Sequence, residues 1–391
     1  MKKKLLTTLI MMIFLINFLP AQEKANDEYI EAMTTSDINQ KAQKLKAWVD
    51  KYGGTGAQYE NFAYATLATL PYQGKTPQET IQYGEKALEI GGLDDSTKTQ
   101  VLIHVASVYI NQGSNLDKAA SYAQQVVQTA QKAKSSAEGG NTKAWDQLIG
   151  AGHYTRGQAL EKAGDLSAAI EAYQKSYSIL KNKQIIASLA KIGQSLYEQK
   201  KYSEAINALM AANAVLDNFA MTMYIARAYN RSGNRDKALE YYKKAFNKQK
   251  SGEAAFNAGL ILANKAENDP AFVDEALEYL LYASFLSQEN SEKAMQYAES
   301  LYFSKNQAYN EKVKQLQSKS EELNTLTETF NEKFGEKTEE DLSEAEKEEM
   351  NQMLERIETL QKEIETLQEE QKAELAKFQE LIDQIKQKLG I

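Results

Sequence analysis

Small residues recur at nearly regular intervals through the middle of this 391-residue chain. Four alanines, each followed by a branched apolar residue, lie 33 to 38 residues apart, at Ala169-Ile170, Ala205-Ile206, Ala238-Leu239 and Ala276-Leu277. A repeat of this length is typical of stacked structural units. One pair of helices cannot bury both of its apolar faces, so such units must stack on one another. The repetition therefore restricts the chain to an array of small units.

Each of these units also carries an earlier small residue. These residues are Gly157, Gly193, Ala226 and Gly259, and a large residue follows sixteen to twenty-one positions later at Tyr173, Leu209, Tyr242 and Leu280. The apolar spacing around both sets is that of helices, and only 4 prolines occur in the chain. Side-chain bulk sets the distance between packed helices. We therefore expect the small residues to lie where the two helices of a unit cross.

This pattern resembles the tetratricopeptide repeat. That repeat has small residues at its eighth, twentieth and twenty-seventh positions, with Tyr or Leu at the eleventh, Gly at the fifteenth and an aromatic residue at the twenty-fourth. Four units match well, and two weaker ones precede them, marked by Ala106 with Tyr109 and by Gly74 with Ala87. The resemblance implies an all-α fold, a right-handed superhelical solenoid of about six repeats over residues 55–305. A helix start is expected at Thr76, with Pro77 and Glu79 completing a capping box.

The sequence of the last part of the chain, residues 306–391, predicts two long helices. The first spans 306–334, and the second begins near Thr338. Apolar residues of the second helix mostly step by three and four, as in a coiled coil, through Leu360, Ile364, Leu367, Leu375, Phe378, Ile382, Ile385 and Leu389. Gln371 falls in this seam, where two successive steps of four indicate a stutter. The pattern predicts a helical hairpin or coiled coil, whose unequal arms leave part of the seam to dock on the solenoid or on another chain.

Charge divides along the same boundary. Residues 22–320 contain 34 basic and 33 acidic side chains, whereas residues 321–391 contain 9 and 21. The acidic excess is typical of the solvated faces of long helices, and an acidic docking tail is the alternative. A net charge of −8 argues against a nucleic-acid partner.

The first residues read as a secretory signal peptide, 1–21. Three lysines precede the apolar run from Leu5 to Leu19, and Ala21 suits a cleavage site. The run is short for a permanent membrane anchor, the alternative interpretation. Because the chain has no cysteine, lipid attachment of the bacterial lipoprotein kind is excluded. We expect an exported, soluble protein of a Gram-negative periplasm or cell surface, with a helical segment over 22–54 before the solenoid.

The sequence contains no recognisable catalytic motif. The two histidines, His104 and His153, stand apart, and neither has a neighbouring ligand cluster. Gly74-Lys75-Thr76 resembles the end of a P-loop, but Thr69 stands where that motif needs glycine. We therefore predict no catalytic residues, no metal, no cofactor and no enzymatic activity.

The resemblance implies a surface instead of an active site. In tetratricopeptide proteins the first helix of each pair lines a concave groove that binds peptides. The corresponding positions combine aromatic, amide and cationic groups, which suit an extended peptide, and they are Tyr154, Gln158, Lys191, Gln194, Tyr197, Tyr224, Arg227, Asn230, Arg231, Phe256 and Asn257. The prediction is a scaffold or adaptor that binds a protein partner in this groove. The alternative is a structural envelope component that oligomerises through residues 306–391.

Overall fold

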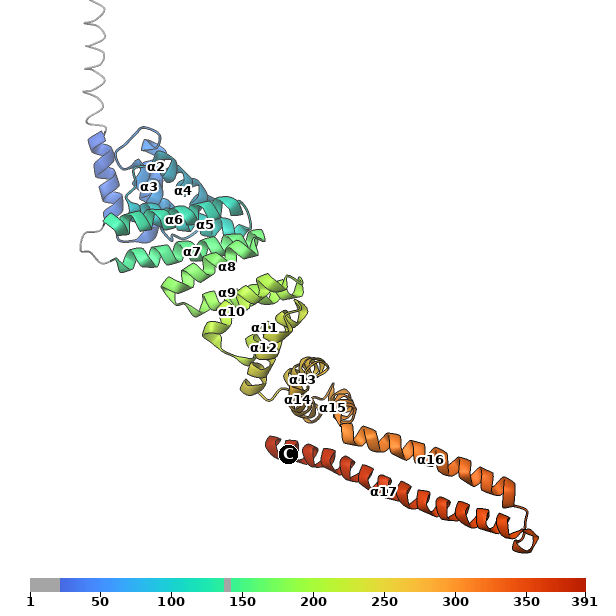
Figure 1. The fold of residues 1–391 in the computed structure, drawn as a ribbon. Coiled ribbons are helices and arrows are strands. Elements are labelled where there is room, and N and C mark those ends of the chain that lie inside the picture. The colour runs from blue at the N-terminus through green and yellow to red at the C-terminus, as the bar shows by residue number, and fades with distance from the viewer. Residues whose placement is uncertain (1–21, 137–141) are drawn as a thin grey trace, which may run out of the picture. The chain divides into compact units, whose positions relative to one another are not determined.

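The computed structural model describes residues 22–136 and 142–391, and every regular element within these ranges is a helix (Figure 1). The all-α prediction is therefore confirmed. The predicted signal peptide lies outside the described residues. The chain forms two compact units, one reaching Leu216 and the other spanning Asp217–Ile391.

The first unit is a series of helices in which each packs against the next. A helix over residues 22–34 opens it. The following helices are α2 Ile38–Tyr52, α3 Glu60–Thr69, α4 Pro77–Ile90, α5 Asp95–Gln112, α6 Leu116–Ser136, α7 Lys143–Ala163, α8 Leu166–Leu180, α9 Lys183–Glu198 and α10 Tyr202–Leu216. The start of α4 is as predicted, because Thr76 and Glu79 form a reciprocal capping box around Pro77.

The recurring small residues lie where paired helices cross. A Cβ placed on Gly157 of α7 would come within 2.8 Å of the Tyr173 ring on α8. The same addition at Gly193 of α9 would come within 2.6 Å of Leu209 on α10. Both large residues are fully buried. Side chains in a close-packed core cannot move away from such a contact without strain. The small and large positions of the repeat are therefore the two sides of one helix crossing.

The N-terminal helix over 22–34 closes one end of the first unit. Trp48 of α2 is buried, and its indole Nε1 donates a hydrogen bond of 2.7 Å to the carbonyl of Ala25. Tyr29 meets Trp48 edge-on and stacks on Tyr59 at a ring separation of 4.7 Å. A terminal repeat exposes an apolar face unless something covers it. Residues 22–34 provide that cover here.

The second unit continues with helix pairs and ends in a hairpin. Its helices are α11 Phe219–Arg231, α12 Arg235–Lys248, α13 Gly252–Ala266, α14 Val273–Leu286, α15 Ser291–Lys305, α16 Gln307–Phe334 and α17 Glu344–Leu389. A 3-10 turn, Pro270–Phe272, leads into α14. The crossing of α13 and α14 repeats the arrangement of the first unit, because a Cβ on Gly259 would come within 2.9 Å of Leu280.

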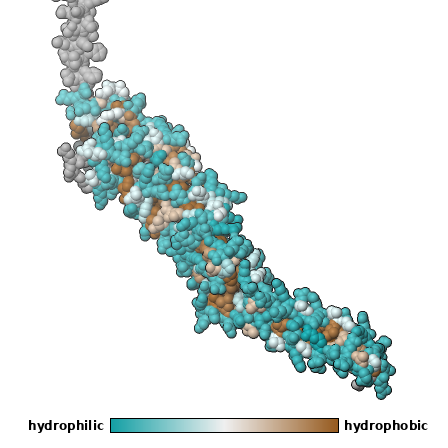
Figure 2. Space-filling model, in the orientation of Figure 1, coloured by the Kyte–Doolittle hydropathy of each residue, from teal (hydrophilic) through white to brown (hydrophobic). Residues whose placement is uncertain are grey.

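Ion pairs fix the register of the hairpin formed by α16 and α17. Lys312 pairs with Glu370 at 2.6 Å, Lys319 with Glu363 at 2.6 Å, and Lys333 with Glu349 at 2.5 Å. Each step forward along α16 is matched by an equal step back along α17, so the two helices run antiparallel. At 1.5 Å per residue, α16 is about 42 Å long and α17 about 69 Å long. The visible face of this hairpin is mostly hydrophilic (Figure 2).

The C-terminal part of α17 returns to the helix pairs of its own unit. Phe378, Ile382 and Ile385 are buried in one cluster with residues of α13, α14 and α15. Phe378 lies 4.8 Å, between ring centroids, from Tyr302 of α15, and Lys388 pairs with Glu278 of α14 at 2.7 Å. The uncovered part of the seam was predicted to dock either on the solenoid or on another chain. In this structure it docks on the last helix pairs and covers their end.

Two details of the predicted hairpin are wrong. Leu375 was placed in the seam, but its side chain is 46% exposed, and Glu374 is buried in its place. Asn306 donates a hydrogen bond to the Glu374 carboxylate at 3.1 Å and Lys377 donates another at 2.8 Å, so the charge is compensated without bulk water. The second helix begins at Glu344 with Ser343 as its cap, because Thr338 caps only a 3-10 turn, Glu339–Asp341.

Candidate functional site

The predicted partner-binding residues are divided between the two units. The first unit holds Tyr154 and Gln158 on α7 and Lys191, Gln194 and Tyr197 on α9. The second holds Tyr224, Arg227, Asn230 and Arg231 on α11 and Phe256 and Asn257 on α13. All of them lie on the first helices of consecutive pairs. The two groups are described separately below.

In the first unit, aromatic residues anchor both helices of the predicted surface. Tyr154 is half-buried and lies 5.8 Å, between ring centroids, from Tyr173. Burial raises the pKa of the Tyr154 phenol, and the charge of Glu161 adds to that shift. Tyr197 tilts against Tyr202 of α10 at 5.6 Å. Lys191 is exposed, and Gln194 is half-buried. The predicted surface of this unit therefore combines packed aromatic rings with polar side chains.

A buried layer supports Tyr154. The hydroxyl of Tyr173 donates a hydrogen bond of 2.7 Å to Glu161 on α7, one helix turn beyond Gln158. Burial raises the pKa of Tyr173, and the hydrogen bond to the Glu161 carboxylate raises it further. The Tyr173 phenol therefore stays neutral and holds the two helices together.

In the second unit, the centre of the predicted surface is a two-point ion pair. Arg227 of α11 donates to the carboxylate of Glu253 on α13, from Nε at 2.7 Å and from Nη2 at 2.5 Å. The guanidinium also lies 5.8 Å from the centre of the Tyr224 ring. Planar two-point pairing is the strong geometry for arginine and carboxylate. Arg227 therefore joins neighbouring repeats, and its charge is compensated inside the chain.

Two residues that the sequence interpretation missed extend this surface. One is Glu253, the partner of Arg227, and the other is Tyr297 on α15, whose side chain is 50% exposed. The Tyr297 ring lies 6.3 Å from that of Phe256. The sequence pattern that could have indicated Tyr297 is the pair Ala294 and Ala298. Their spacing is typical of another closely packed helix, α15. The aromatic face thus continues from α13 to α15.

The remaining predicted residues of this unit lie beside the ion pair. Asn257 donates to the backbone carbonyl of Glu253 at 2.9 Å, so its amide is partly engaged within α13. Asn230 is half-buried at the end of α11, and Arg231 next to it is exposed. Arg231 forms no ion pair with a carboxylate of the described residues, unlike Arg227. It is the accessible cation of this face.

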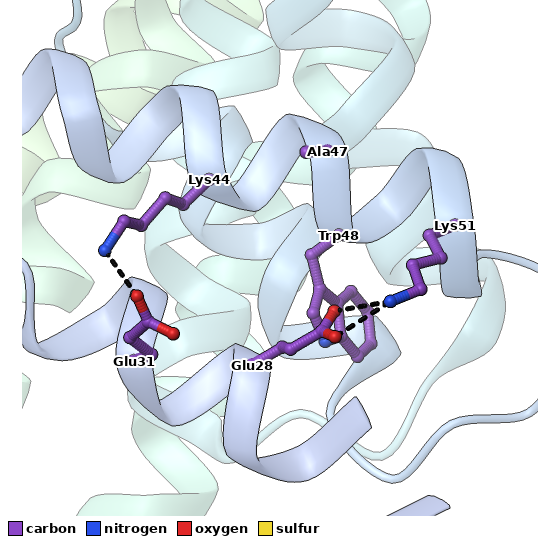
Figure 3. A pocket seen from close by; sticks show the side chains of 6 residues that line it. All are labelled: Glu28, Glu31, Lys44, Ala47, Trp48 and Lys51. Carbon is purple, nitrogen blue, oxygen red and sulfur yellow. Dashed lines mark hydrogen bonds and ion pairs between the residues drawn. The ribbon is translucent and has the colours of Figure 1, made fainter. Parts of the chain in front are cut away.

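The first unit also contains a cavity of about 320 Å³ between the N-terminal helix and α2. Figure 3 shows two ion pairs between the N-terminal helix and α2, one joining Glu28 to Lys51 at 2.8 Å and the other joining Glu31 to Lys44 at 2.8 Å. Hydrogen bonding to Lys51 lowers the pKa of Glu28. Each of these charged groups already has its partner. The two ion pairs therefore hold the terminal helix on α2, and the residues around the cavity present no reactive group.

A second cavity, of about 300 Å³, lies beside Tyr72. Lys46 pairs with Glu79 at 2.5 Å, and this contact together with the capping bond from Thr76 lowers the pKa of Glu79 to about 2. Burial lowers the pKa of Lys75 to about 8, and its ammonium donates to the carbonyls of Ala68 at 2.5 Å and Leu70 at 3.1 Å. These bonds satisfy the end of α3, so Lys75 has a structural role.

The described residues contain no group of three His, Asp or Glu side chains placed to hold a metal ion. His104 on α5 is exposed and its Nδ1 lies 2.9 Å from the carbonyl oxygen of Gln100, whereas His153 is half-buried on α7. Within the described ranges, no helix combines the length and the apolar character needed to cross a bilayer.

Comparison with known families identifies the repeats. The family model described as tetratricopeptide repeat matches residues 151–181 and 225–247. The first stretch covers most of α7 and α8, and the second covers part of α11 and α12. No curated protein matches the chain. The chain therefore carries tetratricopeptide repeats within an all-α fold.

Solved structures similar to the chain include three proteins with low sequence identity. A tetratricopeptide repeat protein from Parabacteroides merdae is 13% identical, with 72% of this chain and 99% of that one covered and a TM-score of 0.34. MamA protein is 19% identical over 49% and 93% of the two chains, with a TM-score of 0.30. The TPR2AB domain of yeast Sti1, in complex with an HSP90 peptide, is 18% identical over 66% and 98%, with a TM-score of 0.24.

Proposed function

We propose that this protein is a non-enzymatic adaptor of the bacterial cell envelope that binds a protein partner on the first helices of its repeats. Tetratricopeptide repeats generally mediate contacts between proteins, through the extended surfaces that stacked repeats create. The N-terminal sequence, with its lysines and short apolar run, supports export. The docking of the α17 seam within its own unit favours this role over oligomerisation through that seam.

One observation carries the proposal. In the second unit, side chains from three separate helices form a joined face: Tyr224 and Arg227 from α11, Glu253 and Phe256 from α13, and Tyr297 from α15. Tyr297 remains 50% exposed although the chain buries most of its large apolar residues. Aromatic residues that combine an apolar ring with a polar tip are enriched in protein interfaces. We infer that Tyr297 and Phe256 receive an apolar side chain of the partner.

The Arg227–Glu253 pair decides which variants test this proposal. Reversing the charge at Arg227 would place two carboxylates against each other and disturb the packing of α11 on α13. Loss of binding in that variant would then say little about the partner. Arg231 is the better target, because it is exposed and has no carboxylate partner among the described residues.

The test compares matched variants in a pull-down from cells of the source organism. Tyr297→Ala and Arg231→Glu should each reduce the captured partner at least tenfold, because they alter the exposed part of the face. The control is Tyr241→Ala on α12, which loses a comparable ring contact, 5.6 Å from Tyr229, on a second helix. Unfolding temperature is measured for every variant. Equal capture by all three variants, with unfolding unchanged, would refute the proposed face.

A further inference from the structure

One region of the first unit carries lysines that form no ion pair with a carboxylate of the described residues. Residues 156–201 include eight basic and four acidic side chains. Elsewhere in this unit, lysines commonly form ion pairs, as Lys118 does with Glu85 and Lys134 with Asp146. The exposed lysines of this region do not reach any carboxylate of the described residues within 4.0 Å, and they are Lys162, Lys175, Lys181, Lys183, Lys191, Lys200 and Lys201.

Four of these lysines lie on α9 or just beyond its end, and we call this set the lysine face: Lys183, Lys191, Lys200 and Lys201. From Lys183 to Lys191 the helix rises about 12 Å, at 1.5 Å per residue, and Lys200 and Lys201 stand just beyond its last residue, Glu198. Glu198 is the one acidic residue within α9. The lysine face therefore keeps a clear positive excess along the whole helix.

Positive charge also lies on the helices that precede α9 in the same unit. His153 lies on α7 in the same unit, half-buried. Burial lowers the pKa of its imidazole, and the positive charges of Lys175 and Arg156 lower it further. Lys175 on α8 and Arg156 on α7 therefore make the surroundings of His153 positive.

The opposite charge gathers on one side of α17. Several exposed glutamates of this helix form no ion pair with a described residue, and we call them the carboxylate stripe: Glu348, Glu355, Glu358, Glu365 and Glu380. Exposed Lys362 lies among them, so the stripe has five carboxylates to one ammonium. At about 100° per residue they fall within one arc of about 100°. Leu360, Leu367 and Phe378 are buried on the opposite side of the helix. The stripe thus faces away from the packed seam.

We propose that the lysine face of one molecule binds the carboxylate stripe of a second copy of this chain. The spacing agrees: Glu358 and Glu365 are about 10 Å apart along α17 and Lys183 and Lys191 about 12 Å apart along α9, a difference that side chains of this length absorb. Two carboxylate stripes would repel each other, so the hairpins do not pair with one another through this side. The contact joins two different surfaces and therefore links copies head to tail. It adds to the partner-binding face of the second unit and does not depend on it.

Such a contact has a distinct response to salt. Complementary exposed charges steer association and are screened by added ions. Purified protein should therefore increase in average mass with concentration at about 20 mM salt, and the apparent association constant should fall at least tenfold by about 500 mM salt. Light scattering over a concentration series measures both effects. A monomer at every concentration and salt level would overturn the proposal.

Charge reversal at the two surfaces identifies the contact. One variant carries Lys183→Glu and Lys191→Glu, and the other carries Glu358→Lys and Glu365→Lys. Each variant alone should be monomeric, because its lysine-face and stripe positions then have the same sign. Mixing them should restore association, because the unchanged stripe of the first meets the unchanged lysine face of the second. Association of either variant alone, or none in the mixture, would contradict the proposal.

A matched control separates the specific surfaces from net charge. Lys24→Glu with Lys132→Glu makes the same change in total charge at exposed lysines of the helix over 22–34 and of α6. This variant should associate as the unaltered protein does, and circular dichroism confirms that every variant is folded. If the control loses association to the same extent as the lysine-face variant, a general charge effect replaces the proposal.

Discussion

The crossing of α7 and α8 predicts the effect of one substitution closely. A Cβ on Gly157 would lie 2.8 Å from two carbon atoms of the Tyr173 ring. That ring is 1% exposed, it contacts Tyr154, and its hydroxyl is bonded to Glu161, so it cannot move away freely. Gly157→Val adds the Cβ and two methyl groups at this point, and we expect α7 and α8 to be forced apart.

The magnitude follows from two opposing terms. Overpacking a well-packed core costs about 1–3 kcal/mol, and a branched residue at a backbone crossing belongs at the upper end of that range. Valine in place of glycine inside a helix recovers about 0.3 kcal/mol of helix propensity. The net loss of unfolding free energy is about 2 kcal/mol. For a unit of this size that corresponds to a fall of roughly 4–8 °C in Tm.

Tryptophan fluorescence reports the unfolding of the first unit, which contains Gly157. Trp48 and Trp145 are the chain's two tryptophans, and both lie in that unit. The control is Ser167→Val, an exposed position on α8, which should change Tm by less than about 2 °C because surface substitutions have small effects. Combining Gly157→Val with Tyr173→Leu should reduce the penalty, since the ring is then absent. A Gly157→Val protein as stable as the unaltered one would refute the reasoning about the crossing.

Three further substitutions test other contacts. Glu79→Gln should remove a stabilising contribution that is present above about pH 4.5 and disappears as the pH falls towards 2, because Lys46 and the helix cap depress the pKa of Glu79; acid titration of Tm compares the two proteins, and identical acid profiles would contradict it. Ile385→Ala should cost about 2–5 kcal/mol, because Ile385 is 1% exposed in the core that joins α17 to α14; hydrogen exchange should become faster in both helices, and faster exchange in the hairpin tip alone would argue against docking. Glu374→Ala should leave the amide of Asn306 without its carboxylate and cost about 1–3 kcal/mol, whereas an unchanged urea midpoint would show that the buried carboxylate contributes nothing.

Local periodicity was sufficient to predict the repeats and the long helices. The predicted helix over 306–334 differs by one residue from the observed α16, Gln307–Phe334. Each prediction of this kind depends on residues within a few helical turns of one another. The crossing of Gly157 with Tyr173 was predictable for the same reason, since a small and a large residue recur at matching positions of each unit.

Features that depend on distant residues were not predictable in this way. The predicted seam of α17 follows apolar residues only, and it therefore includes Leu375 instead of Glu374. The Glu374 carboxylate is buried because Asn306, 68 positions earlier, donates a hydrogen bond to it. Likewise the sequence placed Arg227 on a binding surface but could not show that Glu253, in the next repeat, would occupy its guanidinium. Partners in neighbouring repeats follow no fixed spacing, so only the packed structure identifies them.

The central claim is that the face of α11, α13 and α15 binds a protein partner. Site-specific photocrosslinking in living cells tests it most directly, with a photoreactive amino acid placed at Tyr297 and, as the control, at Asn247 on α12, which is also exposed. The account predicts a discrete adduct of one additional protein from position 297 and none from position 247. The same adduct from both positions, or none from position 297 in cells that contain the folded protein, would contradict it.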